Sequence, residues 1–119
     1  MSTSTAYKLL TAKQWVSWQQ SQKFTGASID IRDGYIHLST ANQTSQTYDK
    51  YFKDQPDIVL AAVDLGKVDG EVKWEKSRGG ELFPHVYGTL PFTAVMKIWE
   101  KVTGGIVEGL NHGNRSIDG

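Results

Sequence analysis

The chain has 119 residues, a length that fits one compact domain and leaves little room for a second hydrophobic core. Thirteen basic residues balance thirteen acidic ones, so net charge supplies no attraction for duplex nucleic acid. The absence of cysteine excludes a disulfide framework, a thiolate nucleophile and Cys-ligated zinc. The first six residues are polar, and no apolar run of signal-peptide or membrane-helix length follows them. We therefore expect a soluble, cytoplasmic protein with no membrane partner.

The first half of the chain predicts two strands, each followed by a helix. An apolar strand over 7–10 ends at Thr11, which caps a helix over 12–22. Residues 29–32 alternate apolar and charged side chains, which favours an irregular extended segment over 24–33 before the Asp33-Gly34 turn. A second strand over 35–38 leads into Thr40-x-x-Gln43, a capping box for a helix to about Phe52. The buried stripe of that helix is expected to be Tyr48, Tyr51 and Phe52.

The second half of the chain predicts mainly strands. Residues 58–64 are almost entirely apolar, as in a strand buried on both faces, and 72–75 alternate like a half-buried strand. Pro84 removes a backbone donor from 81–88, which favours an edge strand or a bulge. We interpret 94–102 as a strand because β-branched and aromatic residues dominate it. The order of elements favours one α+β domain over 7–103, with flexible polar segments at 1–6 and 104–119.

The first candidate for chemistry is the end of the second strand. His37 lies there beside Ser39 and Thr40, where the N–H groups of a helix start can meet a hydroxyl or a phosphate. The alternative is that the two hydroxyls only cap the helix and that His37 is a half-buried strand residue. Spacing alone leaves both interpretations open.

A second candidate is the polar loop around Arg78. Arg78 lies between Ser77 and two glycines, so its guanidinium and backbone N–H groups can converge on an anion. The flanking Glu75 and Glu81 offer carboxylates to a ribose hydroxyl or to a developing positive charge. A solvated turn with surface salt bridges is the alternative. The chain contains neither a P-loop nor a dinucleotide-binding glycine motif.

The third candidate is the segment 83–88, which holds two aromatic residues, a histidine, a proline and a glycine within six positions. His85 and Tyr87 alternate with Val86, so on an extended backbone their side chains share one face. If that face meets His37, two imidazoles and a phenol line one pocket; otherwise the segment is a structural turn. His37, His85 and Glu75 also contain the atoms of a two-His, one-carboxylate metal set. Their spacing lacks the H-x-x-x-H pattern of a helical site, so we expect no metal.

Three motifs now follow one another along the chain: Gly34-Tyr35-Ile36-His37-Leu38-Ser39-Thr40, Trp74-Glu75-x-Ser77-Arg78-Gly79-Gly80 and Leu82-Phe83-Pro84-His85-x-Tyr87-Gly88. Together they resemble the bacterial domain of unknown function family 952 over about residues 7–102. That family is similar in fold to the ADP-ribosyltransferases, whose split β-sheet holds NAD in a cleft. The resemblance implies an α+β fold with a split mixed or antiparallel sheet and two helices in the N-terminal half.

The resemblance also implies roles for single residues. The segment 36–39 looks like the Val-His-Leu-Ser of RNA 2′-phosphotransferases, which places His37 at the nicotinamide-side ribose and ring of NAD. His85 falls roughly at the third motif of the transferases, where some branches have Glu. At the first motif the chain departs from the pattern, because the segment 7–11 has neither His nor Arg. Lys8 is the one basic residue of that segment, and the sequence leaves open whether it takes the place of the missing residue.

Three functional hypotheses remain open. The first is an enzyme, a transferase or glycohydrolase, acting on NAD or on an ADP-ribose-like or 2′-phosphorylated nucleotide. Its catalytic residues would be His37, His85 and Glu75. Its ligand-binding residues would be Ser39, Thr40, Arg78, Glu81 and Tyr87. The second is a binding module that keeps the cleft without chemistry, and the third is a protein-interaction domain. The sequence indicates no oligomeric state.

Overall fold

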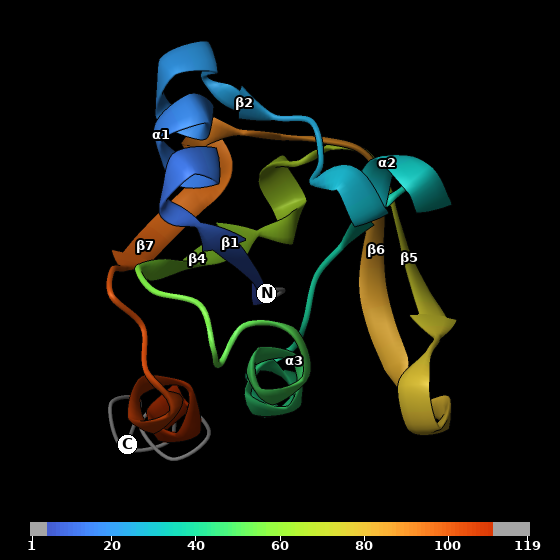
Figure 1. The fold of residues 1–119 in the computed structure, drawn as a ribbon. Helices are drawn as coiled ribbons and strands as arrows, with labels where there is room; N and C mark the ends of the chain where they lie inside the picture. Colours follow the sequence, from blue (N-terminus) through green and yellow to red (C-terminus); the bar gives the residue numbers. More distant parts are fainter. Residues whose placement is uncertain (1–4, 111–119) are drawn as a thin grey trace, which may run out of the picture.

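The structure, a computed structural model, describes residues 5–110 and divides their strands between two antiparallel sheets. The first sheet has the order β1-β4-β7, formed by Thr5–Thr11, Ile58–Asp64 and Val95–Trp99. The second consists of β2 (Lys23–Phe24), β3 (Ile36–His37), β5 (Asp69–Lys76) and β6 (Leu82–Pro91). Figure 1 shows the long β5–β6 hairpin on the opposite side of the molecule from β7. The predicted α+β class is confirmed, with every strand pair antiparallel.

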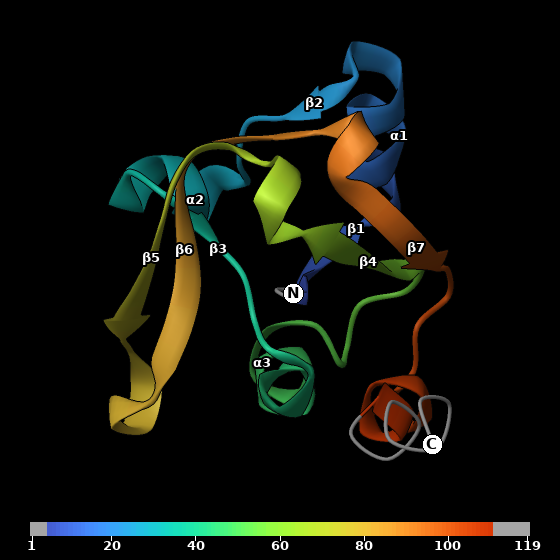
Figure 2. The same cartoon turned by 180° about the vertical axis from the view of Figure 1, so that it is seen from behind.

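Strand β4 is the centre of the first sheet, as its apolar run predicts. Its residues alternate between two hydrophobic clusters on opposite faces. Val59, Ala61 and Val63 face a core under α1 (Ala12–Ser21), which contributes Trp15 and Trp18. The opposite face packs against α3 (Thr44–Tyr51) and against a helix over residues 104–110. Both helices are drawn below the sheet in Figures 1 and 2.

Both predicted helix caps form. The Thr11 hydroxyl accepts from the Gln14 backbone N–H at 3.1 Å, and the Gln14 side chain accepts from the Thr11 N–H at 2.8 Å. The Thr40 N–H donates to the Gln43 side chain at 2.9 Å, and a 3-10 turn over Ala41–Gln43 leads into α3. The predicted stripe of α3 is wrong at Tyr51, which is 44% exposed, while Tyr48 is buried.

The extended segment predicted over 24–33 is wrong from residue 28 onward, because Ser28–Asp33 forms the helix α2. The alternation of apolar and charged residues misleads here, since Ile29 and Ile31 are exposed and the charged Asp30 is buried. The Asp30 carboxylate accepts from the Ala27 N–H at 2.8 Å and caps the helix start. Gly34, at φ +88°, ends the helix in a left-handed conformation that favours glycine.

The edge position predicted for the Pro84 segment is also wrong. Strand β6 lies between β5 on one side and β2 and β3 on the other. The proline is tolerated because β3 pairs with β6 only at Ile36–Val86 and His37–His85, so Pro84 lies past the end of that ladder. Its carbonyl still accepts from the Leu38 N–H at 3.1 Å.

The end of the described chain differs from the prediction of a flexible tail from residue 104. Residues 104–110 are helical, and Val107 and Leu110 are buried against the first sheet. The prediction of a flexible segment over 1–6 is wrong at Thr5 and Ala6, which belong to β1, while residues 1–4 and 111–119 lie outside the described residues. In the part of the chain that the structure describes, no helix has the length and apolar character needed to cross a membrane.

A four-residue segment joins the two sheets. Ile36 and His37 pair with β6, and two residues later Ser39 pairs with Tyr7 of β1. The Tyr7 N–H donates to the Ser39 carbonyl at 2.7 Å, and the Ser39 N–H donates back to Tyr7 at 2.9 Å. Segment 36–39 therefore holds β6 of one sheet close to β1 of the other.

Candidate functional site

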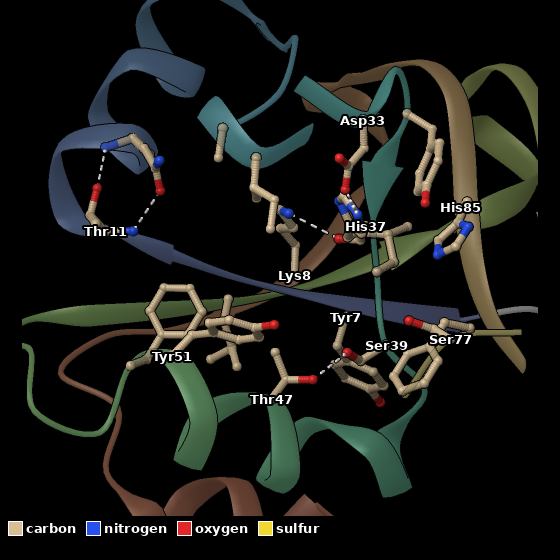
Figure 3. A pocket seen from close by; sticks show the side chains of 18 of the residues that line it. Tyr7, Lys8, Thr11, Asp33, His37, Ser39, Thr47, Tyr51, Ser77 and His85 are labelled. Atoms are coloured by element: carbon tan, nitrogen blue, oxygen red, sulfur yellow. Dashed lines mark hydrogen bonds and ion pairs between the residues drawn. The ribbon is translucent and has the colours of Figure 1, made fainter. Parts of the chain in front are cut away.

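A cavity of about 540 Å³ lies at this junction between the sheets. Lys8 of β1 and residues 37–39 line it, together with side chains of α2 and α3. In Figure 3, His85 from β6 and Ser77 close one end, and Tyr51 of α3 lies toward the other. Chain segments that are far apart in the sequence thus meet around one space.

Three rings form the wall at the β6 end of the cavity. The β3–β6 register places His37 opposite His85, and their ring centroids are 5.4 Å apart. Tyr35 stacks on His85 at 4.1 Å with an interplanar angle of 23°, and its centroid is 4.7 Å from that of His37. Because all three residues line the cavity, the wall offers a guest the faces of aromatic rings.

His85 belongs to a hydrogen-bonded group that extends behind the wall. Its Nδ1 lies 2.6 Å from Oε1 of Glu75. The Tyr87 hydroxyl donates to both oxygens of that carboxylate, at 2.9 and 3.1 Å. Hydrogen bonds from His85 and then Tyr87 lower the pKa of Glu75. Burial and the Glu75 carboxylate raise the pKa of Tyr87 to about 12, so the phenol stays a donor.

His37 is held differently, because carboxylates meet both of its ring nitrogens. Its Nδ1 lies 2.6 Å from Oδ1 of Asp30, and its Nε2 lies 2.9 Å from Oδ2 of Asp33. A neutral imidazole donates to one of the two, and the protonated ring donates to both. In either state the ring nitrogens of His37 are occupied by neighbours in the protein.

Asp30 is the centre of a buried ionic cluster that ties β1, α2 and β3 together. The ammonium of Lys8 lies 3.0 Å from its Oδ2 and also donates to the His37 carbonyl at 2.9 Å. Burial alone would raise the pKa of Asp30. Other effects outweigh burial and lower the pKa of Asp30 to about 2. They are the hydrogen bond from the His37 ring, the charge of Lys8 and the backbone N–H groups of His37 and Ala27. Burial lowers the pKa of Lys8 despite its ion pair with Asp30.

The acid stability of the protein is expected to depend on Asp30. The pKa of the carboxyl falls from 3.8 to about 2 on folding. The ionised carboxyl therefore contributes roughly 2 kcal/mol to the free energy of unfolding. This contribution is complete above about pH 4 and is lost as the pH falls through about 2. An NMR titration of the Asp30 carboxyl carbon measures this directly. A midpoint at or above the unperturbed value would contradict it.

Comparison with known protein families matches residues 9–98 to the family described as "Protein of unknown function (DUF952)". The chain belongs to this DUF952 family. A crystal structure of protein CC0527 from Caulobacter crescentus is 36% identical, with a TM-score of 0.77, and the match covers 82% of this chain and 85% of that one. A solution NMR structure of CC0527 is 38% identical, with a TM-score of 0.68, covering 80% and 82%. No curated protein matches the chain.

The DUF952 match contains most of the cavity. Tyr35, His37, Ser39 and His85 lie within residues 9–98, as does Glu75 behind the wall. Tyr7 and Lys8 precede the match, and the helix over 104–110 follows it. The family description and the names of the solved structures state no activity.

The structure brings some of the site residues predicted for this DUF952 protein together and leaves others outside. His37, Ser39 and His85 line the cavity, whereas Thr40, Glu75, Glu81 and Tyr87 are not among its lining residues. Glu81 instead accepts from the Gln43 side chain at 3.3 Å. The backbone of Arg78 lies in a 3-10 turn directly after the cavity residue Ser77, and its side chain lies outside what the structure describes. Within residues 5–110, no cluster of three or more His, Asp or Glu residues is arranged to hold a metal ion.

Sequence reasoning missed several residues of the site. Tyr35 is two residues before His37, a spacing that puts both side chains on one face of an extended segment. That signal was available in the sequence. Asp30 and Asp33, the partners of His37, had no such signal because the helix that presents them was not predicted.

Proposed function

We propose that this DUF952 protein binds a nucleotide of the NAD or ADP-ribose class in the cavity between its two sheets. The fold in this proposal is the ADP-ribosyltransferase-like one that its motifs resemble. The observation that carries the proposal is the wall of Tyr35, His37 and His85 at the sheet junction. The cavity volume of about 540 Å³ lies within the range of small-molecule sites, about 300–1,000 Å³.

The chemistry of the lining suits a flat ring attached to a sugar. Tyr35 offers an aromatic surface at one end, and the exposed Tyr51 lies on α3. Ser39, Thr47 and Ser77 supply hydroxyl groups to the lining, and the Ser39 and Thr47 hydroxyls lie 3.2 Å apart. Such groups bind ribose hydroxyls and phosphate oxygens.

The charges of the lining suggest how the phosphates lie. The ammonium of Lys8 is neutralised by Asp30 inside the protein. Arg32, whose side chain is 71% exposed, lines the cavity and pairs with Asp33. The guanidinium of Arg32 therefore meets a phosphate more readily than Lys8 does. In the proposed pose the ring of the nucleotide lies inward and its phosphates lie toward solvent.

Titration with NAD and with ADP-ribose tests the proposal. We expect amide NMR shifts in residues 35–39, 47–51 and 77–85, and none in β7. Replacing Tyr35 with alanine should weaken binding by about tenfold or more, because aromatic stacking on a base contributes roughly 1–3 kcal/mol. Met96→Ala is the control, since Met96 is exposed on β7 and does not line the cavity. Unchanged spectra at millimolar nucleotide would refute the proposal.

Binding without turnover is a second candidate, and one observation favours it. Breaking a glycosidic bond generates positive charge that a carboxylate usually stabilises. Glu75 and Glu81 do not line the cavity, and Asp33, which does, is engaged by His37 and Arg32. Release of free nicotinamide from NAD distinguishes an enzyme from a binding module.

A further inference from the structure

We infer that His85 is the general base of this cavity, that Glu75 is its positioning residue, and that a nucleotide held there is hydrolysed. This inference rests on the proposed function. It assigns one histidine of the pair to chemistry and the other to structure.

The contact with Glu75 determines which nitrogen of His85 carries the hydrogen. An ionised carboxylate only accepts hydrogen bonds, so Nδ1, at 2.6 Å from Oε1, is the donor. The Tyr87 hydroxyl holds both carboxylate oxygens and stops Glu75 from turning away. In the neutral ring the lone pair is then on Nε2. Carboxylate–imidazole pairs fix the tautomer of catalytic histidines in the same way.

The His85 side chain is only 3% exposed, and the cavity that it lines is the route by which a guest reaches that lone pair. Among the side chains that the structure describes, His85 contacts Glu75 through Nδ1, stacks on Tyr35 and meets the edge of His37, and no hydrogen bond from its Nε2 is found. Figure 3 shows the imidazole projecting from β6 into the cavity. His37 has no equivalent atom, because Asp30 and Asp33 engage both of its nitrogens.

A base at this position can catalyse hydrolysis at the ribose of NAD, with activation of the attacking water in place of the carboxylate stabilisation that the engaged Asp33 does not supply. As the oxygen of a water molecule bonds to the ribose carbon that carries nicotinamide, one water proton passes to Nε2 of His85. The carbon–nitrogen bond breaks and its electron pair goes to the ring nitrogen, so nicotinamide leaves neutral and ADP-ribose remains. His85 then releases the proton to solvent. While protonated, the ring is stabilised by the Glu75 carboxylate and by the stacked Tyr35.

Nitrogen-15 NMR of the histidine rings tests the positioning role without any ligand. We expect neutral His85 to carry its hydrogen on Nδ1 in the natural protein. Glu75→Gln should populate the opposite tautomer, because the amide group can donate to Nδ1. Glu71→Gln is the matched control, being an exposed residue of the same strand. Finding the hydrogen on Nε2 in the natural protein would overturn the inference.

Nicotinamide release from NAD tests the catalytic role. His85→Asn keeps an amide donor near the position of Nδ1 and removes Nε2, so we expect release to fall by roughly 100-fold while the fold is kept. Glu75→Gln should lower release by roughly tenfold or more, and Glu71→Gln should leave it unchanged. Absence of NAD binding defeats the proposed function and this inference together. NAD binding without release, or release that survives His85→Asn, overturns this inference alone.

Discussion

Replacing Asp30 with alanine is expected to lower the free energy of unfolding by about 3–5 kcal/mol, because it leaves a buried charge without a partner. The Lys8 ammonium, with a side chain 8% exposed, would lose its counter-ion. The Ala27 N–H, the His37 N–H and the His37 ring would lose the acceptor they share. Domains of this size are stable by only about 5–15 kcal/mol, so the loss is a large fraction of the total. Urea unfolding followed by tryptophan fluorescence measures it.

A second substitution shows how much of the stability lost in Asp30→Ala comes from the unpaired charge of Lys8. The double variant Lys8→Met, Asp30→Ala removes the stranded ammonium, so we expect it to be more stable than Asp30→Ala alone. Lys101→Ala is the control, because its pair with Asp57 is exposed and its loss should cost less than about 1 kcal/mol. An Asp30→Ala protein as stable as the control would show that the cluster does not hold β1, α2 and β3 together.

Local chemistry was enough to predict much of the fold. The apolar run over 58–64 gave the central strand β4 with its bounds, and Thr11 and Thr40 formed the expected caps. Helix α2 was missed because it has six residues and buries a carboxylate instead of its isoleucines. Its formation depends on Lys8 and His37, which reach Asp30 only after the chain has folded.

The site was predictable where one strand determines it and unpredictable where strands must pair. The alternation of His85 and Tyr87 correctly put both on one face of β6, where both reach Glu75. The opposition of His37 and His85 depends on the β3–β6 register, which no local pattern sets. A second register, that of β5 with β6, pairs Glu75 with Phe83 and so brings it to His85 from behind the wall.

Two glycines hold the start of the hairpin that carries Glu75 and His85. Gly70 of β5 pairs with Gly88 of β6, and Gly70 has φ +108°, a conformation that favours glycine. A Cβ atom on Gly88 would lie 1.8 Å from the Asp69 carbonyl oxygen and 3.0 Å from the Gly70 Cα. Because these atoms belong to the backbone, the two strands must separate to admit even a methyl group.

Gly88→Ala is therefore expected to lower the free energy of unfolding by about 3 kcal/mol or more, at or beyond the upper end for overpacked sites. It should also shift amide signals along β5 and β6 and weaken the Nδ1–H signature of His85, since Glu75 lies on the displaced strand. Gly109→Ala is the matched control, because no heavy atom lies within 4 Å of its added Cβ. Its effect should stay within about 1 kcal/mol. If Gly88→Ala destabilised the protein but left the His85 tautomer unchanged, the contact with Glu75 would not depend on the strand spacing at this pair.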